Sequence, residues 1–187
     1  MKHIAIILLH VIFLGMASAG QMTNKPLNFN QYLEQDKSAK KAEAEKKFRR
    51  MEQILENREF VLEADYLSNQ YGSRVPVTST LNFIKVDSTA GVIQIGSNSG
   101  MGYNGVGGIT ADGNITKYDL DINEKRKTFF IQMTVMTSIG TYDVSMSVGP
   151  DGYANATLSG MRRGRLNYTG SIVPLQATRT FEGTASY

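Results

Sequence analysis

The sequence predicts a mainly β protein, an antiparallel β-sandwich or open barrel preceded by one long charged N-terminal α-helix. Three observations predict this fold. Residues 31–57 contain no glycine or proline and are dominated by Ala, Glu, Lys, Gln and Arg, which favour helix. After residue 58, apolar and polar residues alternate, as they do in half-buried strands. Turn residues then separate short stretches at regular spacing, which is typical of antiparallel sandwiches and barrels.

The first 19 residues predict a secretory signal peptide. Met1-Lys2-His3 is a short basic start, an apolar run extends from Ile4 to Met16, and Ala17-Ser18-Ala19 is a cleavage pattern of small residues. The apolar run is about 13 residues long, whereas a membrane span needs roughly 20. We therefore expect cleavage, no transmembrane span afterwards, and an exported protein, either periplasmic or secreted.

The residue types that remain after cleavage exclude several kinds of chemistry. The chain has no cysteine, and its two histidines, His3 and His10, both lie in the predicted signal peptide. The mature chain thus excludes histidine-dependent triads, thiol nucleophiles, disulfides, and zinc sites built on Cys or His. It also excludes a lipid anchor on cysteine. The net charge of +3 falls to +2 when Lys2 is removed, so the sequence gives no case for nucleic acid as a partner.

A flexible leader is expected over residues 20–30, and the charged helix follows over 31–57. Acid–base pairs four residues apart favour a solvent-exposed helix. These pairs are Asp36–Lys40, Glu43–Lys47 and Glu45–Arg49. An apolar stripe exists only in the second half of the helix, so we expect that half to dock and the first half to stay in solvent. The stripe consists of Phe48, Met51, Ile54 and Leu55.

Residues 58–174 predict the antiparallel β domain. Clean alternation indicates sheets with one buried face. Asn123–Arg126 and Gly149–Gly152 are predicted turns, since a proline presets φ in the second and its glycines permit positive φ. The segment 175–187 is expected to be a tail or an edge strand. The predicted strands lie at 60–67, within 75–86 (one strand or two), and at 91–95, 116–122, 128–137, 142–148, 152–158 and 166–173.

A glycine-dense stretch supplies the first candidate binding residues. Residues 100–105 match the G-x-G-x-x-G pattern of dinucleotide sites, which requires a helix to begin directly after it. Gly107 and Gly108 disfavour such a helix, so we expect no nucleotide cofactor. A loop between strands is the favoured interpretation, and loops often carry ligand contacts. Tyr103 and Asn104 are therefore candidate ligand-binding residues.

Arginines supply the second candidate site. Arg162, Arg163 and Arg165 form the densest positive spot in the β region, where they could bind a phosphate or carboxylate through paired hydrogen bonds. Solvated arginines are also ordinary at a hairpin turn, and this alternative stays open. Asp119–Asn123 is similar to the start of a calcium loop, but glycine is missing at the sixth position and glutamate at the twelfth. No metal is expected.

Several stretches resemble a bacterial family called domain of unknown function 4251. Asn57–Ala64 is similar to its opening strand, and Tyr103–Ile109 to its glycine-rich middle. Tyr142–Ala154 and Tyr168–Ile172 are similar to its late hairpin and closing strand. The resemblance extends from about residue 54 to 173. It implies an exported protein, often lipid-anchored, of gut bacteria similar to Bacteroides, although the lipid-bearing cysteine is absent here. It implies no known activity and no site residues.

The sequence thus favours an exported, non-catalytic binding or envelope-structure module. Its partner would be a small molecule or an envelope protein, with no nucleic acid and no cofactor. The alternative is a hydrolase that uses paired carboxylates, such as Glu63 and Asp65, on envelope glycans. In a third hypothesis the helix is the interaction device and the sheet is its scaffold. Whether the protein is an enzyme stays open, and the missing His and Cys favour a non-enzyme.

Overall fold

The computed structural model describes residues 29–96, 108–160 and 164–186, and it divides into two compact units between Lys37 and Ser38. The first unit contributes the start of helix α1 (Phe29–Asn57), and the second contributes the rest of α1 and all the strands. The strands are β1 (Glu59–Asn69), β2 (Arg74–Pro76), β3 (Phe83–Asp87), β4 (Ala90–Ile95), β5 (Ile109–Asn123), β6 (Thr128–Thr137), β7 (Gly140–Val148), β8 (Tyr153–Gly160) and β9 (Arg165–Pro174), followed by a 3₁₀ turn at Leu175–Ala177.

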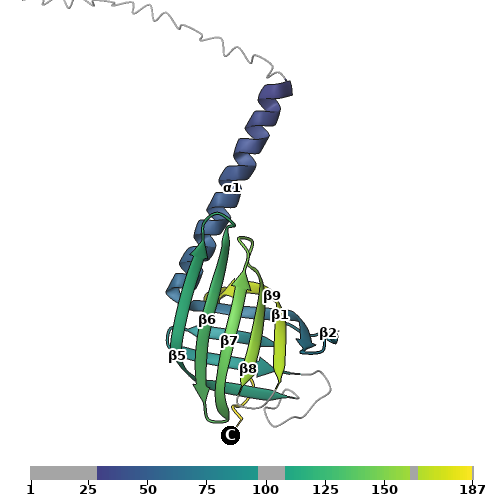
Figure 1. Cartoon of the computed structure of the whole chain (residues 1–187), viewed down its shortest axis with the longest axis vertical. Helices are drawn as coiled ribbons and strands as arrows, with labels where there is room; N and C mark the ends of the chain where they lie inside the picture. The colour runs from purple at the N-terminus through teal and green to yellow at the C-terminus, as the bar shows by residue number, and fades with distance from the viewer. Residues whose placement is uncertain (1–28, 97–107, 161–163, 187) are drawn as a thin grey trace, which may run out of the picture. The chain divides into compact units, whose positions relative to one another are not determined.

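The predicted fold class, mainly β with one helix, is confirmed. The predicted architecture, a sandwich or an open barrel, is imprecise because the sheet closes on itself. All pairings are antiparallel, and the sheet order is β2-β1-β3-β4-β5-β6-β7-β8-β9 with an additional pairing between β1 and β9. That pairing closes β1 and β3–β9 into an eight-stranded barrel, and β2 is an extra strand on β1. Figure 1 shows β5–β9 side by side, with β1 next to β9.

Closure depends on β1, which has neighbours along both of its edges. One edge pairs with β3 over Glu59–Glu63 and with β2 over Tyr66–Ser68. The other edge pairs with β9 from Phe60 to Asn69, with a register shift between Ala64 and Tyr66. Such a bulge bends the strand and increases its twist, which a closing sheet requires.

The interior of the barrel is filled by apolar side chains. Every second residue of the strands points inward, and these side chains form one cluster with the helix. An eight-stranded barrel is just wide enough for side chains to fill its interior. The largest fully buried side chains of this cluster are those of Phe48, Leu55, Phe60, Leu62, Ile84, Phe129, Ile131, Met133 and Tyr168.

The second half of α1 packs against this cluster, as the sequence predicts. Phe48, Met51 and Leu55 are buried, and the ring of Phe48 stacks on that of Phe129 with centroids 4.7 Å apart. The helix ends at Asn57, and Arg58 takes a positive φ of 56° that turns the chain into β1. Within the described ranges, no helix has the length and apolar character needed to cross a membrane.

Ion pairs hold α1 to the turn between β5 and β6. Arg49 contacts Glu45 at 3.1 Å, Glu52 at 2.8 Å and Glu124 at 2.9 Å. Lys127 contacts Glu45 at 2.9 Å and Glu124 at 3.2 Å. Hydrogen bonds from Lys127 lower the pKa of Glu45, and those from Arg49 and Lys127 lower the pKa of Glu124. The predicted pair Glu45–Arg49 is confirmed and belongs to this network.

The C-terminal segment lies over the outer face of the barrel beside β1, β3 and β4. Val61, Phe83 and Val92 are almost fully buried although they point away from the main cluster, and Leu175 packs against them. Leu175 therefore covers a second, smaller apolar cluster. We call residues 175–186 the strap; farther along, the backbone N–H groups of Phe181 and Ser186 donate to the carbonyls of Thr80 and Thr110.

Gln94 is the main polar anchor of this strap. Its side chain is fully buried on β4, and its amide nitrogen donates to the carbonyls of Leu81 (3.1 Å) and Phe181 (2.8 Å). Its amide oxygen accepts from the Thr110 hydroxyl (2.9 Å) and from the Gly183 backbone N–H (2.7 Å). All four hydrogen-bonding positions of the amide are used, so its burial costs little.

Replacing Gly170 with alanine tests barrel closure. Gly170 pairs with Ala64 at the bulge, and a Cβ there would overlap the carbonyl of Glu63. Because backbone rather than a flexible side chain would have to move, we expect Gly170→Ala to lower the free energy of unfolding by about 3 kcal/mol or more. Urea denaturation measures this. The control is Ser171→Ala at the exposed next position, and equal effects of the two changes would contradict the closure argument.

Acid unfolding tests the ion-pair network. The folded-state pKa values of Glu45 and Glu124 lie below the ordinary value of 4.5, so their stabilisation is complete above about pH 4.5 and is lost as the pH falls through the lowered values. We expect the Tm of Glu124→Gln to fall less between pH 6 and pH 3 than that of the unchanged protein. Glu56→Gln, on the same helix outside this network, is the control. Parallel Tm curves for all three proteins would refute the network's contribution.

Candidate functional site

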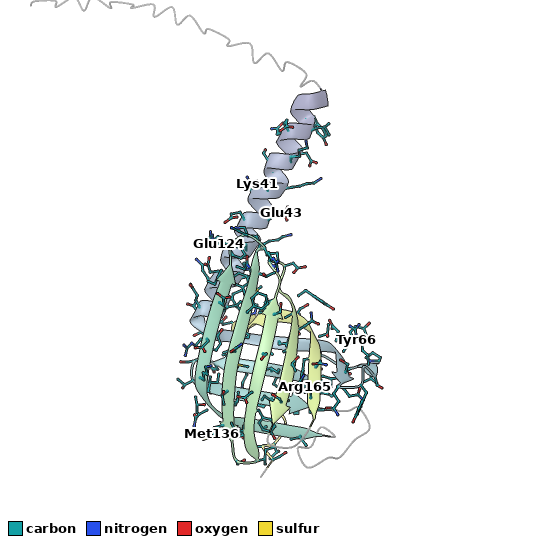
Figure 2. The ribbon with its side chains drawn as sticks, in the orientation of Figure 1. Lys41, Glu43, Tyr66, Glu124, Met136 and Arg165 are labelled. Atoms are coloured by element: carbon teal, nitrogen blue, oxygen red, sulfur yellow. The ribbon has the colours of Figure 1, made fainter. Side chains whose placement is uncertain are left out.

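Of the five candidate residues from the sequence, only Arg165 lies in the described part of the chain. Tyr103, Asn104, Arg162 and Arg163 lie outside the described residues. Arg165 is exposed at the start of β9, opposite Ser159. In Figure 2 it lies away from Glu124, which marks the end of the barrel where α1 packs. The loop and arginine sites thus remain predictions.

The carboxylates that suggested a hydrolase, Glu63 and Asp65, lie on outward-facing positions of β1, and Glu63 is engaged in another contact. Glu63 accepts a 2.6 Å hydrogen bond from the Thr178 hydroxyl, and Asp65 is exposed. Asp119 pairs with Lys117 at 2.9 Å on the outer face of β5. Among the described residues, no group of three His, Cys, Asp or Glu side chains could hold a metal ion.

The most distinctive surface is an uncharged patch on the outer face of β6–β9, which we call the neutral patch. It consists of two neighbouring rows that cross the four strands, since each row follows paired residues from one strand to the next. None of its eight residues is ionisable, although side chains on exposed strand positions are often charged. The rows are Phe130, Ser147, Asn155 and Thr169, and Gln132, Ser145, Thr157 and Asn167.

Hydrogen bonds between strands orient the polar groups of the neutral patch. The Thr169 hydroxyl donates to the amide oxygen of Asn155 at 2.9 Å, and the Thr157 hydroxyl donates to that of Asn167 at 2.8 Å. In each bond the asparagine oxygen is the acceptor. The NH₂ group of Asn155 therefore points away from Thr169 and remains a donor. The patch therefore offers fixed donors and acceptors without charge.

Aromatic rings accompany these polar groups. Phe130 belongs to the patch and is 43% exposed, while Tyr153, two residues before Asn155 on β8, is 46% exposed. On the far side, Tyr66 of β1 pairs with Thr169, and the guanidinium of Arg74 lies 3.8 Å from the centroid of its ring. Large exposed rings beside hydrogen-bonding groups are typical of ligand-binding surfaces.

Charged residues border the neutral patch rather than enter it. Asp119 and Asp121 of β5 pair with Gln132 and Phe130 on one side. Asp143, in the next row along β7, accepts a 2.7 Å hydrogen bond from the Thr134 hydroxyl. A neutral ligand on the patch would therefore meet hydroxyls, amides and ring faces.

Alternation along each strand already placed Ser145 and Ser147 outward, but the sequence analysis did not identify the patch. The signal that could have found it is the paucity of charge at outward positions of four strands in succession. Aligning those positions into rows requires the register between strands, which a single sequence does not supply.

Comparison with known proteins identifies relatives of the chain. The family model "Domain of unknown function (DUF4251)" matches residues 42–172. The crystal structure of a DUF4251 family protein from Bacteroides eggerthii DSM 20697 is similar, with 24% sequence identity and a TM-score of 0.60. The likeness covers 71% of this chain and 90% of that chain, and it shows a shared fold. No curated protein matches the chain.

A charge placed in the neutral patch is expected to leave the fold intact. Asn155→Asp keeps the oxygen that accepts from Thr169, and the position is exposed, so the free energy of unfolding should change by less than about 0.5 kcal/mol. Urea denaturation measures it. Ala156→Asp, one residue on and pointing into the core, is the contrasting variant and should unfold the protein. A large loss of stability in Asn155→Asp would show that the patch supports the fold.

Proposed function

The chain belongs to the DUF4251 family, and from that premise we propose that it is an exported, non-catalytic binding module whose binding surface is the neutral patch. The observation that carries this proposal is the patch itself, two rows of oriented uncharged groups beside exposed rings. These groups are not needed to fill the core, because the interior cluster is built from the opposite faces of the same strands.

The packed interior supports a surface site. Phe60 of β1 and Ile131 and Met133 of β6, which face inward, are at most 2% exposed. A carrier of the kind that encloses its ligand would need an interior left open. Binding on the outer face is compatible with this filled core, and it keeps recognition separate from stability.

Export is supported by the sequence of residues 1–19, with its basic start, apolar run and small-residue cleavage pattern. We propose that the mature protein is periplasmic or secreted and that it contacts a small molecule or another component of the bacterial envelope. Without a cysteine to carry a lipid, we propose that it is not lipid-anchored through that residue.

A carboxylate-based hydrolase of envelope glycans is the second candidate, and the geometry favours it less. A glycosidase needs one carboxylic acid with a raised pKa facing a second carboxylate. The carboxyl pKa values displaced in this chain, those of Glu43, Glu45 and Glu124, are lowered by neighbouring cations. The helix as an interaction device is also less supported, because its apolar residues from Phe48 onward are used in the core.

Native mass spectrometry of the protein purified from its own host envelope tests the proposal. We expect recovery in the exported fraction with residues 1–19 removed and with a bound species. Asn155→Asp should reduce the retained fraction at least about tenfold, because an ionised group in the patch must be desolvated against a neutral ligand. Met136→Ala, a 55% exposed position on β6 outside the patch, should retain the species.

Three results would count against the proposal. An empty monomer would contradict binding, an uncleaved cytoplasmic protein would contradict export, and equal retention by Asn155→Asp would contradict the patch as the binding surface. Removing residues 31–47 tests the helix hypothesis in the same assay, since loss of the bound species with an intact barrel would favour the helix instead.

A further inference from the structure

We propose that the neutral patch binds an uncharged polysaccharide chain, laid across strands β6–β9 with sugar rings against Phe130 and Tyr153. This inference rests on the proposed function and names the ligand class of the same site. The juxtaposition that carries it is two rows of uncharged side chains, seven of them hydroxyls or amides and the eighth the exposed ring of Phe130, with the exposed ring of Tyr153 beside them.

Charge complementarity selects the ligand class. A neutral sugar presents hydroxyls that both donate and accept, and the patch presents serine and threonine hydroxyls together with the amides of Gln132 and Asn155. The amide of Asn167 is engaged within the sheet by Thr157 and Ser68. A phosphate or an acidic polysaccharide would find no cation among these eight residues. Asp119 and Asp121 border them on the β5 side, and the bordering cations are Arg165, two residues before Asn167, and Arg74, on the ring of Tyr66. The patch therefore favours uncharged ligands over anions.

The exposed aromatic rings offer apolar faces on which sugar rings can pack, in addition to the hydrogen-bonding groups. One face of a pyranose ring consists of C–H groups, which pack on the electron-rich face of an aromatic ring. Phe130 and Tyr153 lie on β6 and β8, two strand spacings apart across the sheet, and Tyr153 is offset by two residues along its strand from Asn155, the residue in the row of Phe130. The two positions are therefore about 12 Å apart. Two platforms at that separation suit different units of one extended chain.

The length of the patch points to a polymer rather than a single sugar. From Phe130 to Thr169 a row crosses three strand spacings, about 14 Å. Tyr66 continues the same row by pairing with Thr169 on β1. A single sugar would contact only part of this surface, whereas a linear chain can contact groups on all four strands.

A peptide fits this surface less well. Peptides recognised by sheets usually add as a strand to a free edge, where backbone groups give the affinity. Each of β6, β7, β8 and β9 already pairs on both sides. A ligand on this face therefore meets side chains only, and those side chains are hydroxyls, amides and rings.

Affinity gel electrophoresis of the purified protein tests the inference. The gels contain one soluble neutral polysaccharide each (a β-glucan, an α-glucan, a mannan, a xylan or a levan), and polygalacturonate serves as the acidic comparator. We expect retardation by at least one neutral polymer and none by polygalacturonate. Phe130→Ala, Tyr153→Ala and Asn155→Asp should each raise the apparent Kd about tenfold or more.

Tyr71→Ala is the matched control, because it removes an 83% exposed tyrosine at the β1–β2 turn, outside the patch. It should bind like the unchanged protein. The assignment of the patch would be overturned if all three patch variants were still retarded by the polymer. It would also be overturned if Tyr71→Ala weakened binding as much as the patch variants do. Folding of each variant is checked by its Tm.

The outcomes separate this inference from the proposed function. One outcome is that no neutral polymer retards the protein, while native mass spectrometry finds a different bound species that Asn155→Asp loses. This outcome would overturn the assignment of a polysaccharide ligand but would support the proposed binding module. Failure in both assays would overturn both. New reducing ends in the incubated polymer would overturn the non-catalytic function and favour the hydrolase.

Discussion

The structure depends on the pairing of β1 with β9, which turns a nine-stranded sheet into a closed barrel. The two strands meet along most of their length, across a bulge at which Gly170 lets the backbones approach. Without this pairing β9 would be the edge of an open sheet, and its unpaired N–H and C=O groups would be available to other chains. Closure also gives every strand of the barrel one inner and one outer face, so the core and the surface can be specified separately.

The two sides of the outer surface use their polar residues differently. On β4, the amide of Gln94 is buried, and it forms all four of its hydrogen bonds with the strap and with Leu81 and Thr110. On β8, Asn155 accepts one bond from Thr169 and stays exposed, whereas Asn167 on β9 is partly buried, accepts from Thr157 and donates to the Ser68 hydroxyl at 3.5 Å. The first arrangement fixes the C-terminal segment in place. The second arranges donors and acceptors for something outside the chain.

The sequence predicted the features that depend on interactions between residues close together along the chain. The helix, its docking through Phe48, Met51 and Leu55, and the Glu43–Lys47 and Glu45–Arg49 pairs depend on residues within one or two turns of each other. The closure of the sheet could not be predicted in this way, since β1 and β9 are about a hundred residues apart and their register is set by the whole fold. The neutral patch was missed for the same reason. Four strands must be aligned before Phe130, Ser147, Asn155 and Thr169 form one row.

Stability alone does not account for the composition of that row. Threonine and asparagine bonded across strands strengthen a sheet modestly, and this explains Asn155 with Thr169. It does not explain why Phe130 and Tyr153 remain nearly half exposed, because a ring gains its hydrophobic stabilisation only when it is buried. It also does not explain why the charged residues Asp119, Asp121, Asp143 and Arg165 lie around the two rows and none lies within them. Charged side chains within the rows would favour solubility at no cost to the core. A ligand that covers the rings and bonds the amides accounts for both observations at once. The barrel then supplies the rigidity that holds those groups in place before the ligand arrives, which lowers the entropic cost of binding.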